Sequence, residues 1–224
     1  MTSTQLPVFQ QVRMAIVANM RPGFVLWCML AALLLGNATI PAVATGLAQW
    51  GAYKQAGGFL AAFLSYVVFA VLVPEVLSHL VLRQRWTRRA VVDMAYAGLV
   101  FGCIGITVDL FYALQVSLFG DANDLQTIVK KMLLDQFVYS PVTNFTVIAM
   151  LAWRDDGFRS RSWVRVVSLD FLRSHYLPVL VALWCVWIPG VMVIYLMPTA
   201  LQFPVASMIL SFWILIFKFM RAKE

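Results

Sequence analysis

The sequence predicts an all-α protein, a polytopic transmembrane helical bundle of about six spans with both termini on the same, inner side. Three observations predict it: the composition, the length of the apolar runs and the distribution of basic residues. Of the 224 residues, 62% are hydrophobic and only 12% are charged, whereas charged residues make up about a quarter of an ordinary soluble domain. The mean hydropathy is +0.83, which is typical of a membrane protein.

Six apolar runs have about the length that a membrane-spanning helix needs, roughly 17 to 25 residues. The last two are joined closely through "MPTALQFP" and are expected to form a helical hairpin or one broken helix. We expect a single uncleaved domain over 1–224. The predicted spans cover residues 24–47, 57–81, 91–118, 131–153, 177–197 and 200–219.

The basic residues give an independent prediction of topology, because short loops on the side from which helices insert retain Lys and Arg. With the N-terminus inside, fourteen of the 17 basic residues fall in inner segments, and only Lys54, Lys130 and Lys131 are outer. Six spans satisfy this alternation and five do not. The net charge of +7 is spread over four inner segments without an aromatic platform, which indicates anionic lipid rather than nucleic acid as the partner.

Polar residues inside the spans need partners, because an ionised group in hydrocarbon costs about 2.5 to 3.5 kcal/mol. Glu75 and His79 share one helix face and can form an interfacial ion pair, with a metal or proton site as the alternative. The three cysteines have no metal-binding spacing, and we expect no cofactor and no metal. The candidate groups that line a pore or lock helices together are Asn37, Asp109, Asp135, Gln136 and Asn144.

A stripe of small residues marks the third predicted span. Gly98, Gly102, Gly105 and Asp109 follow one another at steps of four, three and four and therefore lie on one face. Glycines on such a face let a neighbouring helix approach closely. Asp109 is then turned into the bundle, where it either lines a polar cavity or hydrogen-bonds to a neighbouring helix.

The segment "KKMLLDQFVYSP" combines basic, acidic, amide and proline residues in one predicted span. If Asp124 caps this helix, Lys131 and Asp135 are four residues apart and can pair. Gln136 points elsewhere and shares a face with Asn144, eight residues later. Pro141 frees the carbonyl of Phe137, and such breaks persist in membranes only where other groups satisfy the backbone.

Proline breaks are also expected in the last two spans, at Pro189 and Pro198. The inner loop over 154–175 alternates apolar and basic residues in its second half, which favours a basic helix on the membrane surface that binds anionic headgroups. An interaction surface that faces the soluble phase is the alternative.

The segment "KKMLLDQFVYSP" has basic residues followed by Asp-Gln and a proline. This order resembles a motif of the Mpv-seventeen and twenty-two-kilodalton peroxisomal membrane protein family. The similarity covers roughly 85–220, and 48–82 resembles an insertion. Asn37 stands where the family usually has aspartate, and Asp109 where it often has histidine. Further matching features are "RRAVVDMAYAGLVFGCIGITVDLFYAL" with Phe111 and Tyr112, then "LDFL", Trp184, Trp187, Pro189, "IYLMP" and Trp213.

The resemblance implies an integral protein of the mitochondrial inner membrane or the peroxisomal membrane that acts as a channel or permeability modulator. A bacterial inner membrane is also compatible with the residues. The leading hypothesis is therefore transport of small solutes or ions, with membrane lipids as partners and a homo-oligomer as a further option. A structural or adaptor protein is the alternative. We expect no enzyme, because no span carries a nucleophile and base at usable spacing.

Overall fold

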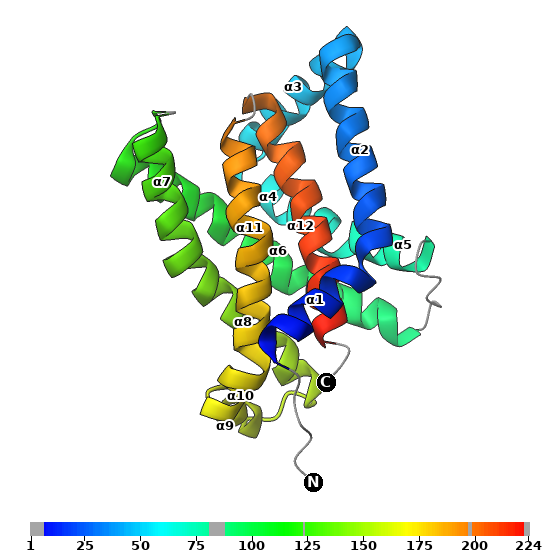
Figure 1. The fold of residues 1–224 in the computed structure, drawn as a ribbon, viewed down its shortest axis with the longest axis vertical. Coiled ribbons are helices and arrows are strands. Elements are labelled where there is room, and N and C mark those ends of the chain that lie inside the picture. Colours follow the sequence, from blue (N-terminus) through cyan, green and yellow to red (C-terminus); the bar gives the residue numbers. More distant parts are fainter. Residues whose placement is uncertain (1–6, 81–87, 123, 197–198, 222–224) are drawn as a thin grey trace.

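The computed structural model describes residues 7–80, 88–122, 124–196 and 199–221, and these residues form helices and connecting turns without any strand. Figure 1 shows α11 and α12 side by side in the centre, with α7 and α8 along one flank and α2 and α3 along the other. The all-α prediction is confirmed. The helices are α1 (Val8–Ala18), α2 (Met20–Thr39), α3 (Pro41–Ala56), α4 (Gly58–Tyr66), η1 (Val67–Leu72), α5 (Val73–Leu80), α6 (Arg88–Phe119), α7 (Leu125–Leu134), η2 (Asp135–Tyr139), α8 (Ser140–Asp155), α9 (Arg161–Val166), α10 (Leu169–Phe171), η3 (Leu172–Tyr176), α11 (Leu177–Leu196) and α12 (Thr199–Arg221).

Four helices of the described residues are long and apolar enough to cross a membrane: Gly58–Leu80, Ala90–Phe119, Leu169–Ile194 and Gln202–Arg221. They correspond to four of the six predicted spans. The first predicted span falls on α2 and α3, and α1 with α2 forms a pair bent by 62° that would make a fifth span if it crosses as one.

The fourth predicted span, 131–153, lies in the continuous helix α7–η2–α8 but is not among these candidates. Its charged, amide and proline residues lower the apolar character of the helix. The described residues therefore support four or five spans where six were predicted, and the sidedness of the termini stays a prediction.

The glycine-rich face of α6 is the contact surface for α4. A Cβ atom added to Gly105 would lie 2.6 Å from the backbone oxygen of Ala62, and one added to Gly102 would overlap the ring of Phe63. Gly98 lies further along the face, where an added Cβ would be 3.7 Å from Val67, an ordinary contact. The close approach of two backbones thus depends on Gly102 and Gly105.

Three long helices each contain one π-helical turn that ends two residues before a proline: η1 before Pro74, η2 before Pro141 and η3 before Pro178. In each, the residue before the proline donates its N–H to the carbonyl five residues earlier. The proline cannot donate the next bond of this series. The carbonyl five residues before the proline is therefore left for another partner.

Side chains of neighbouring helices donate to two of these carbonyls. The hydroxyl of Ser211 in α12 donates to the Phe69 carbonyl at 2.6 Å, and the indole of Trp184 in α11 donates to the Gln136 carbonyl at 2.8 Å. The sequence pattern named the carbonyl of Phe137, four residues before Pro141, whereas the donor from α11 reaches the carbonyl of Gln136, five residues before it. The π turn thus leaves the Gln136 carbonyl without a backbone donor.

The segment after α8 differs from the single surface helix that the sequence predicted. The helix α9 covers only Arg161–Val166, and from Leu169 the chain already belongs to the long helix that continues as α11. Val166 and Phe171, which the alternation placed toward lipid, are buried in the main core. Tertiary packing of α9 and α10 beneath α8 and α11 outweighs their amphipathic pattern.

The glycine contact predicts a graded response to alanine. We expect Gly105→Ala to lower the free energy of unfolding by about 1 to 3 kcal/mol, as overpacking does, because the carbonyl of Ala62 cannot move without displacing α4. Thermal unfolding of the purified protein in detergent measures it. Gly98→Ala is the control and should be neutral or stabilising by up to about 1 kcal/mol. Equal losses at Gly98 and Gly105 would contradict the contact.

Candidate functional site

A cavity of about 90 Å³ lies inside the bundle, between α6, the η2–α8 helix, α11 and α12. Three of the predicted polar residues, Asp135, Gln136 and Asn144, line it together. Four residues with a hydroxyl group line the same cavity: Tyr66, Tyr139, Ser140 and Thr143. The remaining wall is apolar: Phe101, Ile104, Val108, Leu183, Leu210, Ile214 and Phe217, with Val147 and the aromatic Tyr112, Trp187 and Trp213.

Gln136 and Asn144 are the most unusual residues of this lining. Their exposed fractions are 1% and 7%, yet Oε1 of Gln136 and Nδ2 of Asn144 have no hydrogen-bond partner within the described part of the protein. A buried polar group left unpaired costs about 1 to 3 kcal/mol. Both residues line the cavity, so an acceptor and a donor without a partner lie in its wall.

The break at Pro141 is what turns this face inward. The indole of Trp184 donates to the Gln136 carbonyl, and the hydroxyl of Tyr176 donates to the Pro141 carbonyl at 2.9 Å. Both bonds come from the α10–η3–α11 helix, so they fasten the broken helix to its neighbour at the level of the cavity. The structure thus brings Gln136 and Asn144 together in the lining of one cavity, as the sequence spacing suggested.

Asp135 lies in the same cavity but not in the predicted ion pair. The hydroxyl of Ser140 donates to its carboxylate at 3.2 Å, whereas Lys131 pairs with Asp121 at 3.8 Å. The two residues are still joined as in an α-helix, with the Asp135 N–H donating to the Lys131 carbonyl, but the ammonium group of Lys131 lies toward Asp121. The predicted pairing of Lys131 with Asp135 is therefore wrong.

The predicted N-cap of this helix is present. The amide and the hydroxyl of Thr127 donate to the carboxylate of Asp124 at 3.0 and 2.7 Å. These bonds, the hydroxyl bond foremost, lower the pKa of Asp124 below its usual value because they stabilise the charged form. Asp124 thus fixes where α7 begins, and with it the register that places Asp135 and Gln136.

A second cavity of about 80 Å³ adjoins the first and contains Asp109. The ammonium group of Lys54 in α3 forms an ion pair with the Asp109 carboxylate. The two cavities share part of their lining, which is Tyr66, Val108, Tyr112, Trp187 and Leu210. Asp109 is therefore separated from Asp135 and Gln136 by a wall of aromatic and aliphatic side chains.

The aromatic residues that carried the family resemblance surround the two cavities. Phe111 stacks on Tyr139 with ring centroids 4.0 Å apart, and the Tyr139 hydroxyl lies 2.7 Å from that of Thr107. Tyr112 and Trp187 form the shared wall, and Trp213 closes the first cavity from α12. These contacts give the aromatic residues a packing role.

Two of the predicted residues lie away from the cavities, and a third cannot be placed. Asn37 is half-exposed in the last turns of α2, and Pro189 is exposed inside α11. Neither belongs to the lining of the two cavities. Pro198 lies outside the described residues.

Sequence reasoning missed several polar residues. Tyr66 and Tyr139 line the first cavity, and buried Gln115 of α6 donates to the Lys131 carbonyl at 2.8 Å, which joins α6 to α7. A tyrosine in an apolar helix is common and gave no signal. Gln115 could have been noticed as an amide near the end of an apolar span.

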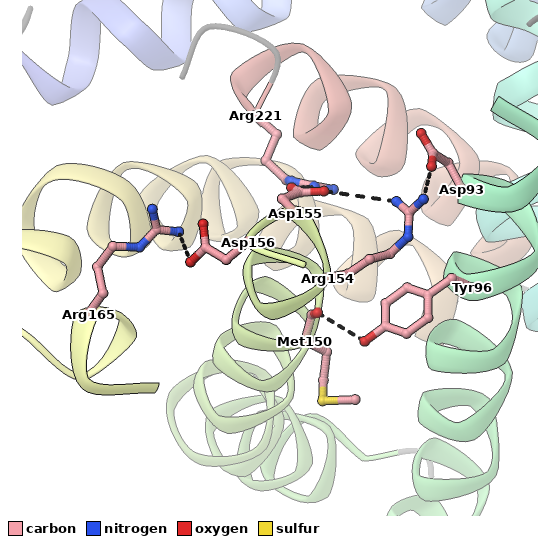
Figure 2. Close-up of polar contacts among 8 residues, drawn as sticks. All are labelled: Asp93, Tyr96, Met150, Arg154, Asp155, Asp156, Arg165 and Arg221. Atoms are coloured by element: carbon pink, nitrogen blue, oxygen red, sulfur yellow. Dashed lines mark hydrogen bonds and ion pairs between the residues drawn. The ribbon is translucent and has the colours of Figure 1, made fainter. Parts of the chain in front are cut away.

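A network of ion pairs closes the end of the bundle where α8, α9 and the last turn of α12 meet (Figure 2). Arg154 contacts Asp93 and Asp155, and Asp155 also pairs with Arg221. Arg165 pairs with Asp156 at 3.1 Å. These pairs join α6, α8, α9 and α12 at one end.

Glu75 adds a further connection between helices. The predicted pair with His79 is present at 3.2 Å, and Lys218 of α12 contacts the same carboxylate. Among the described residues, no group of three or more His, Cys, Asp or Glu side chains is arranged to hold a metal ion. The charged end of the bundle thus has the contacts of a structural clamp.

The fold and the composition are those of a helical integral membrane protein. No protein-family model, curated protein or solved structure matches the chain. The resemblance seen in the sequence motifs therefore stays a hypothesis, and the function has to be argued from the cavities.

The bond between Trp184 and the Gln136 carbonyl predicts an energetic coupling with Pro141. We expect Trp184→Phe to cost about 1 to 3 kcal/mol, because it leaves a buried carbonyl without a donor. In a Pro141→Ala background the new backbone N–H can serve that carbonyl, so the same change should cost less. A double-mutant cycle on the free energy of unfolding measures the difference. Additive losses would show that Trp184 does not compensate for the proline.

Proposed function

We propose that this membrane protein lets small polar solutes cross the bilayer, as a channel or as a modulator of permeability. One observation carries the proposal: a cavity with an unpartnered acceptor and an unpartnered donor lies inside a bundle whose interior is otherwise mainly apolar. Buried polar groups in a membrane bundle commonly mark solute or ion pathways.

The second cavity supports a path rather than an isolated site. It leads from the first cavity, across the wall that contains Tyr66, Tyr112 and Trp187, to the ion pair of Lys54 and Asp109. Rotation of these aromatic side chains would join the two spaces. The proposed closed wall and the broken helix beside it are features that transport proteins use for gating.

A structural or adaptor protein is the second candidate function. The observation that favours it is that Asp109 and Asp135 both have partners inside the chain, Lys54 and Ser140. Such contacts lock helices together and need no solute. On this account, removing the cavity amides changes stability and leaves permeability unaltered.

We also propose which membrane contains the protein and which lipids it contacts. The motif resemblance supports the mitochondrial inner membrane or the peroxisomal membrane. Around α9, the exposed side chains of Trp163, Val164 and Val167 alternate with Arg161 and Arg165. This combination supports contact with anionic headgroups at the membrane surface.

Flux into liposomes tests the proposed function. Purified protein in liposomes should speed the entry of at least one small solute, measured by stopped-flow light scattering for neutral solutes and by an ion-sensitive dye for ions. The double variant Gln136→Leu with Asn144→Leu should lower that flux at least about tenfold, as expected if each lost hydrogen bond is worth about 1 kcal/mol.

Val142→Ala is the matched control, because Val142 lies on the same helix but is 63% exposed and does not line the cavity. Its flux should equal that of the wild type. Folded protein with no flux above empty liposomes would refute transport. A double variant with a lower melting temperature but unchanged flux would favour the structural alternative.

A further inference from the structure

We infer that Gln136 and Asn144 form a binding site for a small neutral solute that carries both hydrogen-bond donors and acceptors, such as a primary amide or a polyol. The inference rests on the proposed transport function and names the class of solute for it. It starts from the two unpartnered atoms, Oε1 of Gln136 and Nδ2 of Asn144, which lie in the same cavity.

The two atoms discriminate between classes of solute. A cation would satisfy the oxygen of Gln136 but would leave the N–H groups of Asn144 unpaired. An anion would satisfy Asn144 but not Gln136, and it would lie in the same cavity as the carboxylate of Asp135. Only a neutral molecule with a donor and an acceptor can pair with either group as it moves between them, and a site that leaves buried groups unpaired rejects the wrong solute strongly.

The hydroxyl groups of the wall add acceptors. Ser140 donates its hydroxyl to Asp135, and Thr143 donates its hydroxyl to the Tyr139 carbonyl at 3.0 Å. With their hydrogens committed, these oxygens keep lone pairs that can accept from a solute. The lining therefore suits a molecule with several N–H or O–H groups and at least one acceptor.

Size and wall character favour a small organic solute over water alone. A single water needs about 10 to 15 Å³ of such space, so a cavity of about 90 Å³ accommodates several waters or one molecule of a few heavy atoms. The apolar side of the lining, including Leu183 and Ile214, offers contacts to C–H groups. Water would leave this side without favourable contacts.

The positions of Gln136 and Asn144 along the helix suggest two successive contact points for a solute. Gln136 and Asn144 are eight residues apart, which is about 12 Å along the axis. A small solute can therefore contact Gln136 at one end of the cavity and Asn144 at the other. Passage along the cavity exchanges pairing with the Gln136 acceptor for pairing with the Asn144 donor, one group at a time.

Binding of acetamide to the purified protein tests the inference without relying on transport. Saturation-transfer NMR should detect acetamide on the wild type, and excess glycerol should displace it. Gln136→Leu and Asn144→Leu should each weaken binding about fivefold, the effect of one lost hydrogen bond of about 1 kcal/mol. Val142→Ala should bind as the wild type does. Potassium chloride and sodium acetate should not compete.

Asn144→Asp provides a second variant in case leucine disturbs folding. It keeps the shape of the side chain but removes the N–H donors and can add a negative charge. Acetamide binding should fall about tenfold while potassium begins to compete. Retained acetamide binding in both Asn144 variants would overturn the inference, as would a folded wild type that binds no acetamide.

The outcomes separate this inference from the proposed function. Acetamide binding without flux through liposomes would refute transport and leave the neutral-solute site in place. Flux of ions without acetamide binding would support transport and overturn the site. A cavity that holds only water gives no saturable acetamide signal and overturns it as well.

Discussion

The hydrogen bond from the indole of Trp184 to the carbonyl of Gln136 holds the central cavity in shape. Pro141 cannot donate to that carbonyl, and in the preceding π turn the N–H of Ser140 bonds to the Asp135 carbonyl instead. Because the indole comes from α11, the same bond that satisfies the backbone also sets the distance between two helices. The rotation of the chain at this break turns Asp135, Gln136 and Asn144 toward one space.

The same combination of a π turn, a proline and a donor from another helix recurs at Phe69, where Ser211 of α12 supplies the hydrogen bond. Tyr66 directly precedes that π turn and forms part of the wall between the two cavities. The close packing of α4 on Gly102 and Gly105 of α6 positions Tyr66 in turn. Two broken helices and one glycine contact thus surround the polar interior, and π turns inside helices are frequent at functional sites.

Much of this arrangement could be read from the sequence, and the remainder depends on contacts between distant segments. Composition and apolar runs predicted the helical membrane class, and the glycine spacing predicted a contact face on α6. The spacing of Gln136 and Asn144 predicted a shared face. Other features depend on pairs of residues 31 to 55 positions apart: the contacts of the glycine face, the pairing of Asp109 with Lys54 and the donation by Trp184. Such pairings follow from packing rather than from local pattern.

Local geometry explains the other differences. The sequence pattern assumed α-helical turns, so it assigned Asp135 to Lys131 and the free carbonyl to Phe137. The π turn adds a residue to one turn of the helix and leaves the Gln136 carbonyl for Trp184. Lys131 pairs instead with Asp121, which precedes α7. For the surface segment after Asp155, amphipathic alternation predicted lipid contact at Val166 and Phe171, yet both complete the core beneath α8 and α11. Alternation alone cannot distinguish a lipid-facing stripe from one that faces protein.

The most direct test of the account is the reactivity of single cysteines at the break, in protein reconstituted in lipid vesicles with Cys28, Cys103 and Cys185 replaced by serine. A small, membrane-impermeant thiol reagent should label Gln136→Cys and Asn144→Cys, because both positions face the polar cavity. It should not label Phe137→Cys or Val142→Cys, because their side chains, 51% and 63% exposed on the outer face of the bundle, would face lipid in the proposed arrangement. Labelling at 137 and 142 with none at 136 and 144 would contradict the account.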